Sequence, residues 1–218
     1  MISTEEQVAE ILLDIRAVHF NEETPFIFTS STASPVYVDC RKLISYPRQR
    51  TLITALSANL IYQKLGKGLI NVVAGGETAG IPYAAWLASE LNLPMIYVRK
   101  AHKGFGRGAQ IEGELHEQAS VILVEDLLFD AQSKVNFCSA IRNAGGDIKH
   151  TLVVFDYGNT TSRENLARVG VELHALTNWS ALLSVGLRGG YFSEQQALVI
   201  RDFLQDPAAW RASRELAE

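Results

Sequence analysis

The chain has 218 residues, a mass of 24.0 kDa and a formal net charge of −4, with 47% hydrophobic and 20% charged residues. This composition is that of an ordinary globular protein, and the acidic balance argues against a nucleic-acid-binding surface. No apolar stretch is long enough to span a membrane, so we expect no membrane partner. Two cysteines without metal-ligand spacing, Cys40 and Cys138, indicate reduced thiols and a cytoplasmic location.

The order of the predicted elements indicates an α/β fold. The N-terminal MISTEEQVAEILLDIR predicts an amphipathic helix over about residues 4–18, begun by a capping box of Ser3 and Glu6, rather than a signal peptide. The elements predicted after it are extended segments at 26–28 and 36–39, a helix at 45–65, a strand at 69–74, a helix at 81–91, a strand at 95–99, a glycine-rich loop at 100–113, a strand from 121, a helix at 133–143, a strand at 151–155, a helix at 163–169, a strand at 171–176, and helices at 179–185 and 193–203.

Alternating strands and helices predict a doubly wound, mostly parallel sheet flanked by helices. We expect three parts of the chain: residues 1–45 as an N-terminal helix and hood, residues 46–206 as the core, and residues 207–218 as a C-terminal tail.

The segment VILVEDLLFDAQSK, residues 121–134, gives the clearest indication of a site. Its apolar start predicts a strand buried on both faces that ends at two adjacent carboxylates, Glu125 and Asp126. Open α/β sheets bind ligands at the carboxyl ends of their strands, and paired carboxylates suit a sugar diol or a hydrated Mg²⁺. A plainer interpretation is that the two acids only end the strand and favour the dipole of the next helix.

Two further loops follow buried strands. AGGETAGIP, residues 74–82, has paired glycines that let backbone approach a ligand and a helix start that suits an anion, although many strand-to-helix turns need glycine for geometry alone. YVRKAHKGFGRGAQIEG, residues 97–113, concentrates cations among glycines, which is typical of a lid that closes on a polyanion, or else of a solvated surface loop. The cations are Arg99, Lys100, Lys103 and Arg107.

Together, the three loops predict one crevice for a phosphorylated sugar with Mg²⁺, in which no base or nucleophile is needed. The histidines do not suggest a competing site, because their positions show no ligand spacing. They are His19, His102, His116, His150 and His174.

Four segments resemble a known family: SPVYVDCRKLISYPR (34–48), VAGGETAGIP (73–82), YVRKAHKGFGRGAQIEG (97–113) and the VED at 124–126. Over nearly its whole length the chain is similar to the orotate phosphoribosyltransferases, within the type I phosphoribosyltransferases. The resemblance implies that orotate attacks 5-phosphoribosyl pyrophosphate to give orotidine 5′-monophosphate and pyrophosphate, in pyrimidine biosynthesis. It also implies Mg²⁺ carried with the phosphosugar, without direct side-chain ligation, and a cytoplasmic homodimer.

The resemblance also implies roles for individual residues. Catalytic roles would fall to Arg99, Lys100, Lys103 and Asp126, with Lys103 in a lid that reaches the partner subunit's site. Substrate contacts would come from the ribose-binding pair Glu125 and Asp126, the 5′-phosphate turn Asp130, Ala131, Gln132 and Ser133, the pyrophosphate loop Glu77, Thr78, Ala79 and Gly80, the lid residue Arg107, and the hood residues Thr29, Ser30 and Tyr37 over the orotate pocket.

The 5′-phosphate turn departs from the family pattern. Leu128 and Phe129 stand where hydroxyls are expected, and Ala131 and Gln132 where glycines are expected. If those glycines are left-handed, each replacement costs about 1–2 kcal/mol unless the loop is reshaped. Ser31 also replaces a usual glycine. FDYGNTT (155–161) lacks an arginine that many orotate enzymes place there, but the subgroup that this chain resembles also lacks it, so this difference has little weight.

Three hypotheses follow from these departures. The chain is an orotate phosphoribosyltransferase that binds the phosphate by another route, such as Ser133 and Lys134 with the helix N-terminus. It is instead a weakened or non-catalytic paralogue that binds a nucleotide or phosphosugar. The altered hood at residues 29–33 also allows a phosphoribosyltransferase for another base.

Overall fold

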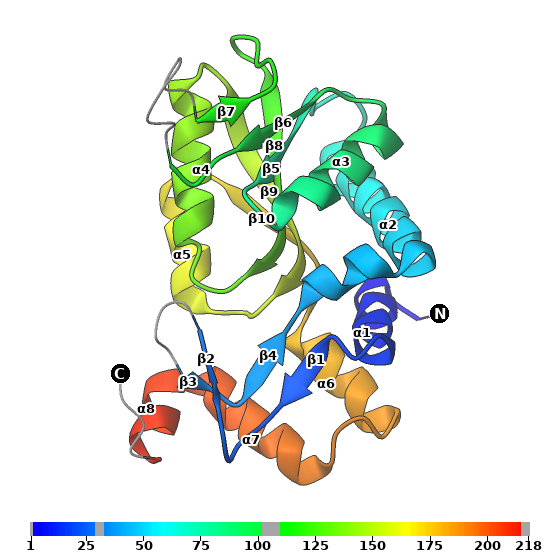
Figure 1. Ribbon diagram of the computed structural model, residues 1–218, viewed down its shortest axis with the longest axis vertical. Coiled ribbons are helices and arrows are strands. Elements are labelled where there is room, and N and C mark those ends of the chain that lie inside the picture. Colours follow the sequence, from blue (N-terminus) through cyan, green and yellow to red (C-terminus); the bar gives the residue numbers. More distant parts are fainter. Residues whose placement is uncertain (1, 29–32, 102–109, 215–218) are drawn as a thin grey trace. The chain divides into compact units, whose positions relative to one another are not determined.

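A computed structural model describes residues 2–28, 33–101 and 110–214 (Figure 1). The described chain divides into two compact units. The larger unit spans Ile44–Leu176, and the smaller unit combines the residues up to Leu43 with those from Thr177 onward.

The larger unit is built on a six-stranded sheet in the order β10-β9-β8-β5-β6-β7. Strand β5 pairs in parallel with β6 and β8, β8 pairs in parallel with β9, and β7 is antiparallel to β6. This confirms the expected doubly wound, mostly parallel sheet. The strands are β5 (Val72–Gly76), β6 (Met95–Val98), β7 (Ile111–Glu112), β8 (Ser120–Leu128), β9 (Asp147–Asp156) and β10 (Glu172–Asn178).

Helices cover both faces of this sheet (Figure 1): α2 and α3 lie on one side, and α4 and α5 on the other. Because both faces are covered, the central strand β8 is apolar on both sides, and Val121, Ile122 and Leu123 are each at most 1% exposed. The helices are α2 (Pro47–Leu65), α3 (Gly80–Leu91), α4 (Gln132–Asn143) and α5 (Thr160–Arg168).

The smaller unit joins the two ends of the chain. Its helix α1 packs against α6, and Thr177 Oγ1 donates to the Glu5 carbonyl at 2.8 Å. The capping box is confirmed, because the Glu6 amide donates to Ser3 Oγ at 3.1 Å and the Ser3 amide to Glu6 Oε2 at 3.3 Å. The elements are α1 (Thr4–Asp14), β1 (Val18–Phe20), β2 (Phe26–Ile27), β3 (Ala33–Ser34), β4 (Val36–Val38), the 3₁₀ helix η1 (Cys40–Ser45), α6 (Trp179–Arg188), α7 (Glu194–Gln205) and α8 (Pro207–Ala212).

The compact units therefore group residues 177–206 with the N-terminal residues, whereas the sequence placed them with the core. The physical reason is the apolar stripe of α1, whose Val8 and Leu12 are fully buried and need a partner helix. Residues 207–218, which the sequence predicts to be a tail, include α8, and Asp206 caps this helix by accepting from the Ala209 amide at 2.9 Å.

One boundary matters for the site. The prediction that the buried strand ends at Glu125 and Asp126 was wrong, because β8 continues to Leu128. Its last residues pair with β9, Leu127 with Phe155 and Leu128 with Asp156. The two acids therefore lie inside a strand.

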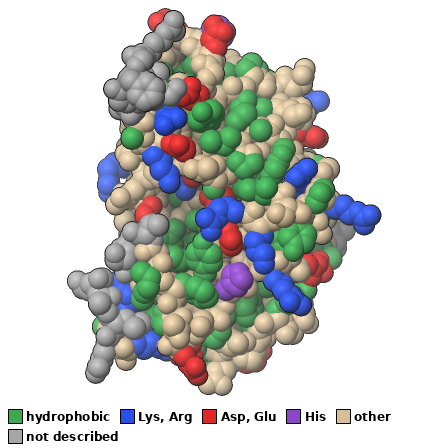
Figure 2. All heavy atoms as spheres, in the orientation of Figure 1, with side chains coloured by type: hydrophobic (Ala, Val, Ile, Leu, Met, Phe, Trp, Pro, Cys, Tyr) green, Lys and Arg blue, Asp and Glu red, His purple; other side chains and the backbone are tan. Residues whose placement is uncertain are grey.

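Over the described ranges, no helix combines the length and apolarity needed to cross a bilayer. On the face shown in Figure 2, Lys and Arg side chains are interspersed with Asp, Glu and apolar ones, so neither sign of charge forms a continuous field there.

Candidate functional site

Glu125 lies in a buried position on β8 and forms an ion pair. Its Oε2 is 2.9 Å from Lys134 Nζ on α4, and both side chains are less than one-tenth exposed. The other carboxylate oxygen, Oε1, is buried without a hydrogen-bond partner. Burial is the main cause that raises the pKa of Glu125 to about 7; Asp126 adds to the shift and Lys134 opposes it.

Two glycines make room for this carboxylate. A Cβ added to Gly76, at the end of β5, or to Gly80, at the start of α3, would overlap Glu125 Oε1. At Gly80 it would also overlap the Val124 carbonyl. The glycine-rich loop is therefore required by the packing of Glu125, in addition to any close approach of a ligand.

Asp126 is 9% exposed, and its Oδ1 accepts from the Leu127 amide at 2.9 Å. Consecutive residues of a strand direct their side chains to opposite faces, so Asp126 and Glu125 do not present two parallel carboxylates to one diol. The structure thus separates the expected ribose-binding pair into a paired, buried Glu125 and an Asp126 on the other face.

The pyrophosphate loop and the base of the cationic loop are joined by hydrogen bonds. Glu77 Oε2 accepts from the Lys100 amide at 2.8 Å, and the Glu77 amide donates to the Val98 carbonyl at 2.9 Å. Across the cationic loop, the Arg99 amide donates to the Gln110 carbonyl at 2.9 Å. These contacts bring Glu77 and Lys100 together at the ends of β5 and β6, beside Thr78, which is exposed, and Ala79, which is half-buried.

The two cations at the base of this loop differ in their accessibility, because Arg99 is half-buried and Lys100 is exposed. Arg99 Nη1 lies 3.8 Å from Glu112 Oε1 on β7, while the Lys100 side chain is exposed. Lys103 and Arg107, the other two cations that the sequence assigns to the lid, lie outside the described residues.

The turn from β8 to α4 has an unusual backbone. Ala131 adopts the left-handed conformation, with φ 64° and ψ −5°, and is 1% exposed. Gln132 is the first residue of α4, and its amide donates to Asp130 Oδ1 at 3.1 Å. One of the two expected glycine positions is therefore left-handed here, and alanine occupies it at a cost of about 1–2 kcal/mol.

The apolar replacements in this turn are packed against the protein. Leu128 is fully buried, and the ring of Phe129 meets the edge of Tyr157 with centroids 5.2 Å apart. The Ser162 hydroxyl on α5 donates to the Phe129 carbonyl. Leu128 and Phe129 thus anchor the turn to β9 and α5. The polar side chains of the turn are those of Asp130, Gln132 and Ser133.

The hood residues fall in two groups. Thr29 and Ser30 lie outside the described residues. Tyr37 lies on β4 in the smaller unit, where its ring is 5.7 Å from Phe26 and 6.0 Å from Phe28, and its hydroxyl accepts from Arg41 Nη2 at 2.6 Å.

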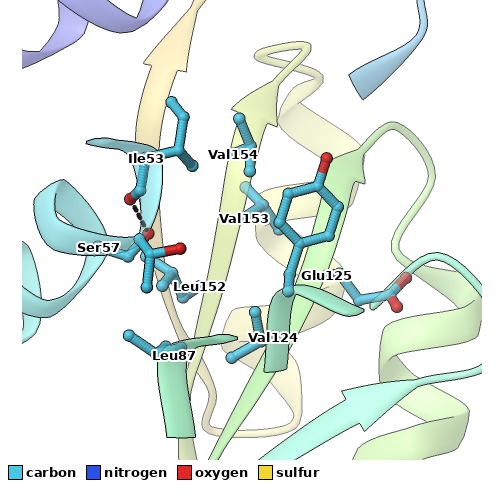
Figure 3. Close-up of a pocket in the computed structure, with 10 residues that line it drawn as sticks. Ile53, Ser57, Leu87, Val124, Glu125, Leu152, Val153 and Val154 are labelled. Carbon is cyan, nitrogen blue, oxygen red and sulfur yellow. Dashed lines mark hydrogen bonds between the residues drawn. The ribbon is translucent and has the colours of Figure 1, made fainter. Parts of the chain in front are cut away.

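A pocket in the larger unit includes Glu125 in its lining (Figure 3). Its walls are mostly apolar side chains of α2, α3, β8 and β9, and the carboxylate of Glu125 points away from them. The candidate site is therefore the set of loops at the carboxyl ends of β5, β6 and β8. Sequence reasoning did not identify Lys134 as the partner of Glu125; its position in the first turn of the helix after the acids was the available signal.

Comparisons with known proteins give consistent results. The chain is 49% identical over 209 residues to the orotate phosphoribosyltransferase of Jannaschia sp. (strain CCS1), covering 95% of this chain and 92% of the relative. It is 47% identical over 206 residues to the orotate phosphoribosyltransferase of Sinorhizobium fredii, covering 94% and 89% of the two chains. No protein-family model matches the chain.

Solved structures show the same fold. The orotate phosphoribosyltransferase of Aeropyrum pernix has a TM-score of 0.71 at 28% identity, covering 85% of this chain and 99% of the other. The UMP synthase of Leishmania donovani has a TM-score of 0.80 at 26% identity, covering 92% of this chain. This chain spans 42% of that larger protein.

Proposed function

Because the chain belongs to the orotate phosphoribosyltransferase family, we propose that its loops after β5, β6 and β8 form a phosphoribosyl-transfer active site. The protein transfers the phosphoribosyl group of 5-phosphoribosyl pyrophosphate to orotate, giving orotidine 5′-monophosphate and pyrophosphate in pyrimidine biosynthesis. The observation that carries this function is 49% identity over 95% of the chain.

Catalysis of this reaction depends mainly on stabilising the charges that develop in the transition state. A ring nitrogen of orotate supplies the electron pair for the new bond to the anomeric carbon, while the carbon–oxygen bond to pyrophosphate breaks and its electrons leave with that group. Positive charge grows on the ribose and negative charge on the leaving group, so fixed charges placed around them lower the barrier.

Residues near the ends of β5 and β6 suit the leaving group. In this proposal Arg99 and Lys100 neutralise the pyrophosphate, together with Lys103 and Arg107. The support is the placement of Lys100, whose amide is fixed by Glu77 while its side chain is exposed. Thr78, Ala79 and Gly80 supply backbone at the start of α3, where a helix N-terminus favours an anion.

The carboxylates present fit a magnesium ion carried by the pyrophosphate. Glu77 and Asp126 offer hard oxygen atoms that would hold the ion through its bound waters, without direct side-chain ligation. When bound, the ion supplies neutralisation of the pyrophosphate charge. Asp126 has a second role in this proposal, which is to accept hydrogen bonds from the ribose hydroxyls.

The 5′-phosphate is assigned to the turn at residues 130–133. Lys134, which the sequence offered as a phosphate ligand, is 6% exposed and paired with Glu125, so it does not serve this purpose. The hydroxyl of Ser133 and the backbone amides at the start of α4 take its place, because a left-handed residue before a helix turns successive amides toward one point.

The partners in this proposal are 5-phosphoribosyl pyrophosphate, orotate and a second copy of the chain, in the cytoplasm. The lid containing Lys103 reaches the site of the second copy, and Thr29, Ser30 and Tyr37 line the orotate pocket. Nucleic acid and membranes have no part in it.

A steady-state assay tests the function. Purified protein with orotate, 5-phosphoribosyl pyrophosphate and Mg²⁺ is expected to release orotidine 5′-monophosphate and pyrophosphate in equal amounts. Uracil, adenine, guanine and hypoxanthine serve as competing bases in parallel reactions. Turnover of one of these bases in preference to orotate, or none with any base at high enzyme concentration, would contradict the proposal.

A further inference from the structure

A cluster of three ligand-type side chains lies on β9 and β10. Glu172 and His174 are two residues apart on β10, so both point to the same face of the sheet. His150 on the neighbouring strand β9 lies beside them. His150 Nδ1 is 3.2 Å from His174 Nε2 and 3.6 Å from Glu172 Oε2.

These separations match those around a metal ion. Four ligands at about 2.0–2.1 Å from a tetrahedral zinc ion are themselves about 3.3 Å apart. The three ligand atoms lie within 4.8 Å of one another, and the Glu172 side chain is 64% exposed, so it has room to adjust.

Burial of His174 favours the neutral imidazole that coordinates a metal ion. His174 is 6% exposed, and burial is the main cause that lowers its pKa, while His150 and Lys64 lower it further and Glu172 raises it. Metal binding requires the neutral imidazole. Lys64 opposes the binding of a cation at this cluster, because its positive charge repels the ion.

We propose that His150, Glu172 and His174 form a binding site for a zinc-like divalent cation, with a water molecule as the fourth ligand. Imidazole nitrogen favours zinc, nickel or cobalt over magnesium, so this site is chemically separate from one that takes Mg²⁺ with pyrophosphate. An ion here links β10 to β9 and stabilises that end of the sheet, with no part in phosphoribosyl transfer.

Calorimetric titration of the full chain with Zn²⁺, in buffer that contains excess Mg²⁺, tests the proposal. We expect one-site binding that falls at least about tenfold in His150→Gln and in Glu172→Gln. Lys64→Gln is expected to strengthen binding several-fold, because it removes the repulsion. His116→Gln, which alters an exposed histidine outside the cluster, is the matched control and keeps the wild-type affinity.

Cobalt provides a second readout. Co²⁺ bound to the wild-type protein is expected to give the intense visible absorption of a tetrahedral nitrogen–oxygen site, and the His150→Gln variant to lose it. The proposal is overturned if Zn²⁺ does not bind, or if it binds equally to the wild type and to both cluster variants. In those cases the contact between the two histidines is only a hydrogen bond.

Discussion

Glu125 and Lys134 form an ion pair in which both side chains are buried. Taking two charges out of water costs several kcal/mol per ion, and the pair recovers this only when its remaining polar atoms are satisfied. Glu125 Oε1 is buried without a hydrogen bond in the described structure. The raised pKa of Glu125 is the consequence, because the carboxyl avoids part of that cost by taking up a proton.

This pair makes stability depend on pH. The pKa of Glu125 is about 7 in the folded chain against 4.5 in the unfolded chain, so between these values the folded state binds more protons. The contribution of Glu125 to the free energy of unfolding is complete below pH 4.5 and is lost as the pH rises to about 7. The loss is on the order of 3 kcal/mol. Urea unfolding at about pH 5 and about pH 7.5 measures the change.

The matched control is the double variant Glu125→Gln, Lys134→Met, which removes both charges and keeps similar volumes. It is expected to lose this part of the pH dependence. An equal slope in the wild type and the double variant would show that Glu125 titrates at its ordinary pKa.

Asp126 is the acid that we assign to the ribose. Asp126→Asn keeps the size of the side chain and the acceptor for the Leu127 amide, and it removes the negative charge. Affinity for 5-phosphoribosyl pyrophosphate is expected to fall about tenfold or more, because charge-assisted hydrogen bonds to the ribose hydroxyls weaken. Calorimetry gives the affinity, and the unfolding midpoint checks that the fold is intact. Unchanged affinity in a folded variant would remove Asp126 from the site.

At the scale of elements, the contacts of α3 with β5 and with β8 depend on the absence of side chains on two glycines. A Cβ on Gly75 would lie 2.9 Å from the Ile81 Cα, and one on Gly80 would overlap both Glu125 and the Val124 carbonyl. The strand-to-helix loop after β5 is therefore held against the strand that carries the acids.

Gly80→Ala tests this contact. Although alanine favours a helix, the added methyl group is expected to destabilise the protein by about 1–3 kcal/mol, because Glu125 and backbone must move. Affinity for 5-phosphoribosyl pyrophosphate should fall with it. Gly68→Ala, where a Cβ meets open space at a positive φ, serves as the control for backbone strain alone and should keep that affinity. Equal affinity in the two variants would contradict the account.

The elements show what the sequence was able to predict. Periodicity and the proline at its start located α2 to within two residues, because both signals are local. Periodicity also located the central part of each parallel strand, although β9 begins at Asp147 and not at residue 151. The end of β8 was missed because Leu127 and Leu128 are held by pairing with β9, which is a tertiary contact. Lys134 and the histidine pair were missed for the same reason: their partners come from another element.

In the candidate site, too, local signals were predictable from the sequence and tertiary contacts were not. Motifs placed the loops at the carboxyl ends of β5, β6 and β8, and the described residues of those loops lie there. Spacing did not reveal that Glu125 is paired inside the protein, since burial depends on the glycines of another loop. The positions of Thr29, Ser30, Lys103 and Arg107 in the site stay predictions.

For the whole molecule, the proposal that Lys103 belongs to a lid shared between two subunits has a measurable consequence. Lys103→Ala is expected to lower turnover about a hundredfold or more while leaving the unfolding midpoint unchanged, because a lid lysine acts chiefly in the transition state. With 5-phosphoribosyl pyrophosphate kept well below its Kd for the Asp126→Asn variant, the about tenfold or greater loss of affinity is expected to leave the site of that subunit largely inactive. When equal amounts of the two variants exchange subunits, half of the dimers are mixed, and each mixed dimer has one intact site.

Activity in the mixture should therefore return to about a quarter of the wild-type value. Sedimentation analysis of the same samples reports the dimer. Each variant incubated alone is the control. If mixing restores nothing although subunits exchange, the lid acts within its own subunit.

The altered turn between β8 and α4 decides whether this family member retains its substrate. Calorimetric titration with 5-phosphoribosyl pyrophosphate and Mg²⁺ tests this most directly, because the 5′-phosphate contributes to binding before any base is present. We predict saturable binding of one molecule per subunit, with affinity lost in Ser133→Ala combined with Asp126→Asn. No binding at millimolar ligand would contradict the account, since the Leu128–Ser133 turn would then no longer hold a phosphosugar.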